Sequence, residues 1–198
     1  MKKLFIIVCA TLCLTLCGCS KEVTPTSVTK DFVEGMRNEI KTNYLEYFGD
    51  VTETEDSFSK EFEEKLANSI AGFDYSINNE TIDGDNATVN VTFKTYDYGL
   101  FIKTFLGEYI QKAFTLALGG GTEEDVEKIA NELAEEKFEE MTKEGKKSEL
   151  SMDFKLNKVD GSWVLDEEAN KDSLANAITG GLYSAVESIQ DQYSNLFN

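Results

Sequence analysis

The chain has 198 residues and no histidine, and 37 Asp and Glu outnumber 19 Lys and Arg, which gives a formal net charge of −18. Such a charge argues against nucleic acid as a partner, because phosphate contacts depend on clustered Lys and Arg. The absence of histidine removes the commonest zinc ligand and the commonest general acid or base. We therefore expect no cofactor and no metal site.

The N-terminus has the pattern of a secretory signal. Lys2 and Lys3 precede an uncharged, largely apolar run of thirteen residues, 4–16. A basic region followed by a short apolar region is typical of a signal peptide. A permanent membrane span needs about 20 apolar residues, so we expect residues 1–18 to be removed.

The signal ends in Leu16-Cys17-Gly18-Cys19, which resembles the lipobox of bacterial lipoproteins. The resemblance implies that a diacylglyceryl group is attached to the thiol of Cys19 and that cleavage occurs directly before it. Two acyl chains hold a protein stably at a membrane, whereas one chain gives only marginal binding. The motif therefore predicts a protein anchored to the outer face of the cell membrane. The alternative is an ordinary secretory signal that leaves a soluble protein.

The mature chain is predicted to comprise a lipidated tether over 19–23 and a single domain over 24–198. Three of the four cysteines lie in the removed segment, which leaves only the lipid site, Cys19. Loss of Lys2 and Lys3 makes the mature chain still more acidic, and anionic headgroups repel such a surface. We therefore expect the lipid, and not the protein surface, to hold the chain at the membrane.

Hydrophobic periodicity divides the domain into helices and strands. Helical spacing of apolar residues extends from Thr24-Pro25 to Phe48-Gly49, over 58–72, over 100–118, from Thr122 past Met141, and from about Ser173 to Leu196. Period-two alternation predicts one hairpin over 73–77 and 87–93, and a second over 150–156 and 163–165. This order predicts an α+β fold: a curved antiparallel sheet of about four strands with helices packed on it, including an inserted helix pair and a C-terminal helix.

The predicted helix over 100–118 is apolar around most of its circumference, with Lys103, Glu108 and Lys112 among its few charged residues. Charges near the middle of a membrane span would cost about 2.5–3.5 kcal/mol each. We therefore expect a mostly buried helix of the domain. The glycines at 119–121 are expected to end this helix. They do not form a phosphate loop, because no Lys-Ser/Thr follows them and no strand precedes them.

Thr24-Pro25 with its following helix, the strand pair led by Tyr and Phe, and the Asp-Gly-Ser-Trp turn within 159–165 together resemble a known family. They are similar to small Firmicute lipoproteins with a cone-shaped domain like nuclear transport factor 2 and cystatin. The resemblance covers residues 24–170 and implies a concave pocket. The helix pair over 98–145 departs from the short form of that fold and could fill or roof the pocket. The resemblance implies a fold far more than a function.

Asp97 is the best candidate for a catalytic acid or base. It continues the inward row of the strand 87–95 toward the mouth of any cone, and Tyr75, Tyr96 and Tyr98 are near it in sequence. Similar folds that isomerise or dehydrate small ligands use an inward carboxylate with a tyrosine. The simpler interpretation, which we favour, is that Asp97 caps the helix that begins at Tyr98. Likewise, the segment 83–86 is interpreted as a hairpin turn, because it lacks the spacing of a calcium loop.

Three hypotheses for the function stay open. The first is a non-enzymatic binding module, in which the leftover apolar face of helix 100–118 lines a groove for a small apolar ligand or a partner segment. The second is an isomerase or dehydratase that uses Asp97 and a tyrosine. The third is an envelope scaffold or assembly factor whose glutamates over 132–144 meet a basic partner in a salt-sensitive contact.

Overall fold

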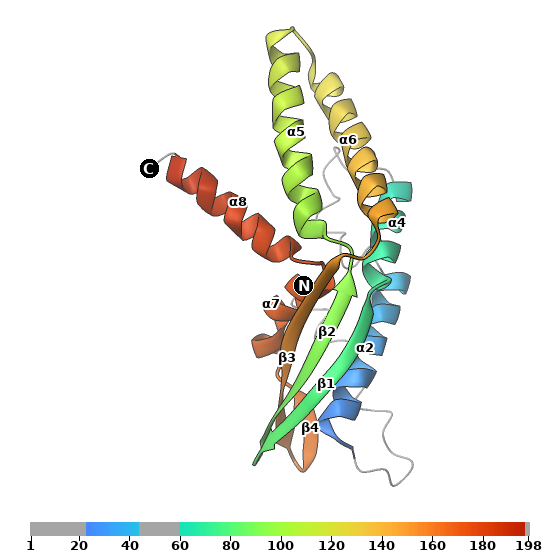
Figure 1. Cartoon of the computed structure of the whole chain (residues 1–198), viewed down its shortest axis with the longest axis vertical. Helices are drawn as coiled ribbons and strands as arrows, with labels where there is room; N and C mark the ends of the chain where they lie inside the picture. The colour runs from blue at the N-terminus through green and yellow to red at the C-terminus, as the bar shows by residue number, and fades with distance from the viewer. Residues whose placement is uncertain (1–22, 44–59, 197–198) are drawn as a thin grey trace.

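A computed structural model of the chain describes residues 23–43 and 60–196 (Figure 1). Its centre is an antiparallel sheet of four strands in the order β1 (Asp74–Asp83), β2 (Asn86–Thr95), β3 (Ser148–Val159) and β4 (Ser162–Leu165). The described helices are α2 (Pro25–Thr42), α4 (Lys60–Ala71), α5 (Tyr98–Leu118), α6 (Glu123–Glu144), α7 (Glu167–Ile178) and α8 (Leu182–Leu196). The predicted α+β class with two hairpins is confirmed.

The central strands β2 and β3 alternate between a packed face and a wet face. In β2 the buried residues are Ala87, Val89, Val91, Phe93 and Thr95. Across the ladder, Phe154 of β3 lies opposite Val89, and Met152 lies opposite Val91. The intervening residues of β3 are exposed and mostly polar. One face of the sheet is therefore core and the other faces water, as the period-two alternation predicts.

The packed face of the sheet is covered by α2 and α7. The buried apolar side chains that they contribute are Phe32, Val33, Met36 and Ile40 from α2, and Leu174, Ala177 and Ile178 from α7. Beneath them, Phe93 and Phe154 of the sheet have no exposed surface. Burial of each large side chain contributes about 1.5–3 kcal/mol. The sheet face on which the resemblance places a concave pocket is thus covered by core side chains.

The first helix is shorter than predicted. Thr24 caps α2 and Pro25 occupies its first turn, as expected, but the helix ends at Thr42 and not near Phe48. The backbone of Asn43 leaves helical geometry, with φ −125° and ψ 37°. The predicted start of the second helix, at residue 58, lies outside the described residues.

The inserted helices α5 and α6 form a helical hairpin that extends beyond one end of the sheet (Figure 1). Only Tyr98 and Gly99 of α5 are buried. The expectation of a mostly buried helix is therefore wrong. The physical reason is that two helices, α6 and α8, are the main neighbours of α5 in the described chain. α8 contacts the first part of α5 and then diverges from it (Figure 1).

The C-terminal segment is also different from the prediction. A single helix from about Ser173 to Leu196 was expected, but α7 begins at Glu167 with Asp166 as its cap, and a corner at 179–181 separates it from α8. Gly180 has φ +54°, and a Cβ there would lie 2.0 Å from the backbone oxygen of Tyr96. The corner requires glycine for both reasons.

Candidate functional site: the projecting helical hairpin

The predicted lipid site, Cys19, and the predicted signal peptide over 1–18 lie outside the described residues. The anchor therefore stays a prediction from the sequence. Among the helices of 23–43 and 60–196, none combines the length and the hydropathy that a membrane span requires.

Asp97 is a helix cap. Its Oδ1 accepts a hydrogen bond of 2.8 Å from the backbone N–H of Leu100, at the first turn of α5. The inward row of β2 ends with buried Thr95 and does not continue to Asp97. The favoured interpretation of Asp97 as a cap is confirmed, and the isomerase hypothesis loses its acid or base.

The tyrosines near Asp97 in sequence have structural partners. The hydroxyl of Tyr98 lies 2.6 Å from the Ser69 hydroxyl, and burial raises the pKa of Tyr98. The hydroxyl of Tyr75 donates to Glu34 at 2.8 Å. Burial and, second, this hydrogen bond raise the pKa of Tyr75 to about 12. Both hydroxyls are held in their protonated form: Tyr98 joins α5 to α4, and Tyr75 joins β1 to α2.

The acidic segment at 83–86 is the turn of the first hairpin. Asp83 pairs with Asn86 across the ladder, and Gly84 has φ +61°. Within the described ranges, no group of three or more His, Cys, Asp or Glu side chains is arranged to hold a metal ion. The interpretation of 83–86 as a turn is confirmed.

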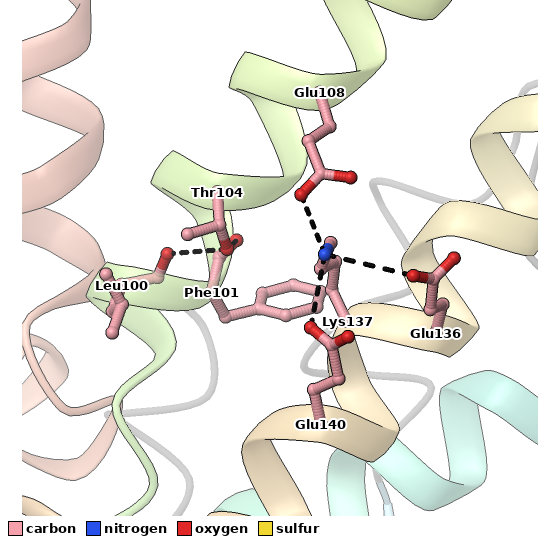
Figure 2. Close-up of polar contacts among 7 residues, drawn as sticks. All are labelled: Leu100, Phe101, Thr104, Glu108, Glu136, Lys137 and Glu140. Atoms are coloured by element: carbon pink, nitrogen blue, oxygen red, sulfur yellow. Dashed lines mark hydrogen bonds and ion pairs between the residues drawn. The ribbon is translucent and has the colours of Figure 1, made fainter.

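The base of the helical hairpin is joined by one lysine among three glutamates (Figure 2). The Nζ of Lys137 in α6 lies 2.7 Å from Glu108 of α5, 3.1 Å from Glu140 and 3.9 Å from Glu136. Only 12% of the Lys137 side chain is exposed. The hydrogen bonds with Glu108 and Glu140 raise the pKa of Lys137, so the lysine stays charged at neutral pH.

Aromatic side chains stack along the same part of α5. The rings of Phe101, Phe105 and Tyr109 are spaced by one helical turn and stack with centroid distances of 6.2 and 5.8 Å. Figure 2 shows the Phe101 ring directed toward Lys137 of α6. Residues one turn apart on a helix lie on one face, so this row forms the side of α5 that meets α6 near the base.

The outer half of α5 presents a second, uncovered apolar row. Ile110, Phe114 and Leu118 are spaced by four residues and are 46%, 66% and 75% exposed, respectively. Their spacing places them on one face of the helix. We refer to these three residues as the apolar stripe. The apolar spacing of these residues is visible in the sequence, but it does not show that the helices and strands of 23–43 and 60–196 leave them exposed.

The partner helix α6 is strongly acidic on its exposed surface. Ten exposed carboxylates lie along it: Glu123, Glu124, Asp125, Glu127, Glu132, Glu135, Glu136, Glu139, Glu140 and Glu144. Some of them are in ion pairs along the helix, such as Glu139 with Lys143 at 3.4 Å. The helical hairpin therefore combines an apolar stripe with an excess of negative charge.

The start of α2 and the tip of the helical hairpin lie at opposite ends of the described domain (Figure 1). The start of α2 is fixed beside the far end of β1, where the N–H of Thr26 donates to Glu80 at 2.7 Å. Figure 1 shows the tip of the hairpin at the other end of the long axis. The chain that leads back to Cys19 thus enters the domain away from the apolar stripe.

No protein-family profile matches the chain, and no curated protein matches it. A solved structure is similar in part: that of a "putative lipoprotein (ycdA)" from Bacillus subtilis, with 19% identity and a TM-score of 0.39. The match covers 80% of this chain and 47% of that one, so the chain spans about half the length of its structural neighbour. A likeness of this size does not establish a common fold, and the expected similarity to nuclear transport factor 2 stays a prediction.

Proposed function

We propose that the protein is a lipoprotein anchored through Cys19 at the outer face of the cell membrane, and that its helical hairpin binds a partner protein. The observation that carries the proposal is the apolar stripe on the helical hairpin, which projects beyond one end of the sheet. Exposed apolar residues that gather on one face commonly mark an interaction site. A helix of this kind is suited to a groove that accepts its apolar row, or to an amphipathic helix laid against it.

The charge of the protein selects the kind of partner. A net charge of −18 and the carboxylates of α6 favour a partner whose apolar contact surface is rimmed by Lys and Arg. Long-range attraction between opposite charges raises the association rate, and salt screens it. The proposal therefore combines two earlier hypotheses: an apolar face for the contact and acidic residues for the approach.

A membrane surface is a less suitable occupant of the apolar stripe. Anionic headgroups repel the carboxylates of α6, and the stripe lies at the opposite end from the start of α2. For the stripe to reach the bilayer that would hold Cys19, the whole domain would have to lie on its side, with its acidic surface against the headgroups. Neither the repulsion by headgroups nor the distance of the stripe from the start of α2 disfavours a protein partner in the extracytoplasmic space.

The small-ligand version of the binding hypothesis has less support. A described cavity of about 350 Å³ lies between β3 and α7 and is not lined by α5. Its lining includes Ser151, Asp153, Lys155, Ser173 and Asn176. Pockets for small ligands are mostly apolar and occupy about 300–1,000 Å³, so this cavity is small and polar for an apolar molecule.

Photo-crosslinking along α5 in intact cells tests the proposal. A photoreactive amino acid is placed at Phe114 in one strain and at Thr115, which is exposed and rotated by about 100° on the helix, in another. We expect a discrete crosslinked protein with the probe at 114, at 110 and at 118, and none at 115. The crosslink should weaken as salt rises and should need Cys19.

Three results would count against this function. Equal crosslinking at 114 and 115 would mean that the stripe is not the contact face. Crosslinking to lipid at 114 would place the stripe in the membrane and overturn the assignment of a protein partner. If only the neutralisation of α6 glutamates abolished the complex, the contact would be the acidic face, as in the scaffold hypothesis.

A further inference from the structure

We propose that the open edge of β3, from Glu149 to Asp153, binds an extended segment of a partner protein that adds a strand in line with β4. This site lies on the sheet and is separate from the helical hairpin. The inference rests on backbone groups that point outward from β3, on the groove beside them and on the charge along the edge.

β4 covers only a third of the edge that it shares with β3. It has four residues, and its ladder extends from Leu156 to Val159 of β3. From Ser148 to Lys155, β3 pairs with β2 on one side but with no described strand on the other. An antiparallel strand directs the N–H and C=O of alternate residues to opposite sides.

Lys155 shows which residues point toward the open side. Its N–H donates to the side chain of Asn170 at 2.9 Å, and its C=O accepts from the same side chain at 2.9 Å. By alternation, the N–H and C=O of Asp153 and Ser151 point the same way. Within the described residues, no hydrogen bond to these backbone groups occurs on that side.

Asn170 also shows which kind of polar group binds to this edge of β3. The residue is 1% exposed, and its carboxamide presents one donor and one acceptor, as the backbone of a neighbouring strand would. The next such positions along the edge, at Asp153 and Ser151, follow at intervals of about 6.8 Å. A strand placed beyond Asn170 would therefore continue the pattern that β4 and Asn170 begin.

The groove leaves room for such a strand. The cavity of about 350 Å³ is bounded by residues 150–153 of β3 and by Ala169, Ser173, Asn176 and Ala177 of α7. Ala169 and Ser173 are exposed and lie one turn apart on the same side of α7. Their short side chains leave space between α7 and the edge of β3. Figure 1 shows α7 alongside the β3 edge, beyond which no strand follows in the described chain.

Charge along the edge favours a partner over a second copy. Glu149 and Asp153 are exposed on the same face of β3, and neighbouring β2 contributes Lys94, which is paired with Glu149 at 3.2 Å. In antiparallel self-pairing centred on Ser151, Asp153 of each copy would face Glu149 of the other, and like charges directly opposite each other are destabilising. A partner segment that places Lys or Arg opposite Asp153 would be attracted to this edge, whereas a second copy of the chain would be repelled.

The test uses a matched pair of substitutions at one position. Ser151→Pro removes the outward N–H but no backbone hydrogen bond to β2, and proline is tolerated at a strand edge. Both this variant and Ser151→Ala lose the hydroxyl contact with Thr92, so that loss is matched. Ser151→Ala removes the hydroxyl and retains the N–H. Ser173→Gln lengthens a side chain on the α7 wall and leaves the β3 backbone unchanged. A library of random heptapeptides is selected on the mature wild-type chain, and the peptides are measured by fluorescence polarisation.

We expect peptides with a Lys or Arg flanked by alternating apolar residues, and slower hydrogen exchange at the amides of Ser151 and Asp153 on binding. Ser151→Pro should weaken binding about tenfold, as loss of one hydrogen bond predicts. Ser173→Gln should also weaken binding, while Ser151→Ala and Phe114→Ser should not. The inference is overturned if no peptide binds, if the Pro and Ala variants bind alike, or if the chain dimerises through this edge instead.

Discussion

The guanidinium of Arg37 lies 4.6 Å above the ring centroid of Phe73 and donates to the backbone oxygen of the same residue at 2.8 Å. A second amino group of Arg37 pairs with Glu34 at 2.9 Å, and Glu34 in turn accepts from the hydroxyl of Tyr75. One side chain of α2 thus holds Phe73, the residue directly before β1, by its ring and by its backbone.

Substitution of this arginine by lysine is expected to be costly. Arg37→Lys cannot keep the stacked plane and the two separate donors at once. We expect the free energy of unfolding to fall by about 1–2 kcal/mol, from the lost cation–π contact and hydrogen bond. Urea denaturation measures this change in the free energy of unfolding, and Lys41→Arg, at an exposed position, is the control. An equal effect in both variants would contradict the role given to the Phe73 contact.

Stability should decline in alkaline solution because of Tyr75. Its pKa is raised to about 12 in the folded chain, above the ordinary value of 10. The unfolded chain therefore loses this proton first, so the stability that is present below pH 10 is lost as the pH rises through 12. Tyr75→Phe should flatten the pH dependence of the urea midpoint over this range. An unchanged slope would show that Tyr75 does not cause it.

Removal of the buried Asn170 side chain should weaken the β3 edge. Asn170→Ala leaves the N–H of Lys155 without its partner, although the C=O still accepts from Asp166 at 2.9 Å. Unpaired buried polar groups cost about 1–3 kcal/mol. Thermal and urea unfolding measure the loss. Asn157→Ala, at an exposed position, is the control, and it should change stability by no more than about 0.5 kcal/mol.

Neutralisation of Lys137 should loosen the helical hairpin more than the sheet. Lys137→Met leaves Glu108, Glu136 and Glu140 close together without their common cation. We expect faster hydrogen exchange in α5 and α6 and little change in β2 and β3. Lys143→Met removes an exposed ion pair of the same helix and serves as the control. Exchange that rises uniformly across the domain would show that Lys137 supports the whole fold.

Loss of the predicted lipid site should release the chain from membranes. Cys19→Ser removes the thiol that would carry the diacylglyceryl group, and the acidic surface offers no replacement. Detergent phase partitioning and membrane fractionation measure the effect. Retention of the serine variant in the membrane fraction would refute the lipid anchor and leave the position of the hairpin relative to the bilayer undetermined.

The strands could be read from the sequence because their signal is local. Val89, Val91 and Phe93 alternate with polar residues, and the Asp-Gly dipeptides that follow Ile82 and Val159 mark the turns, so both hairpins were predicted. The C-terminal corner was missed because Ile178 and Leu182 are four residues apart and continue the helical period across it. The two adjacent glycines at 180 and 181 were the available signal for the break.

The candidate surfaces were harder to predict because each depends on which element is absent beside it. The apolar period of α5 is the same whether a neighbour covers Phe114 or water does. Nothing in the sequence distinguishes Asn170, which binds the β3 backbone, from the exposed asparagines of the sheet. The role of Asp97 as a helix cap could be predicted, because an N-cap depends only on the residues that directly follow it in the chain.

With the lipid anchor before the start of α2 and the partner contact on the helical hairpin, as proposed, the domain would act as a lever. β2 and α5 follow each other and run in the same direction (Figure 1), so their lengths add to about 60 Å. Once Cys19 is held in a bilayer, small rotations at the short tether swing the apolar stripe along a wide arc while the start of α2 hardly moves. A single anchored copy would therefore sample a patch of envelope many times wider than its own footprint.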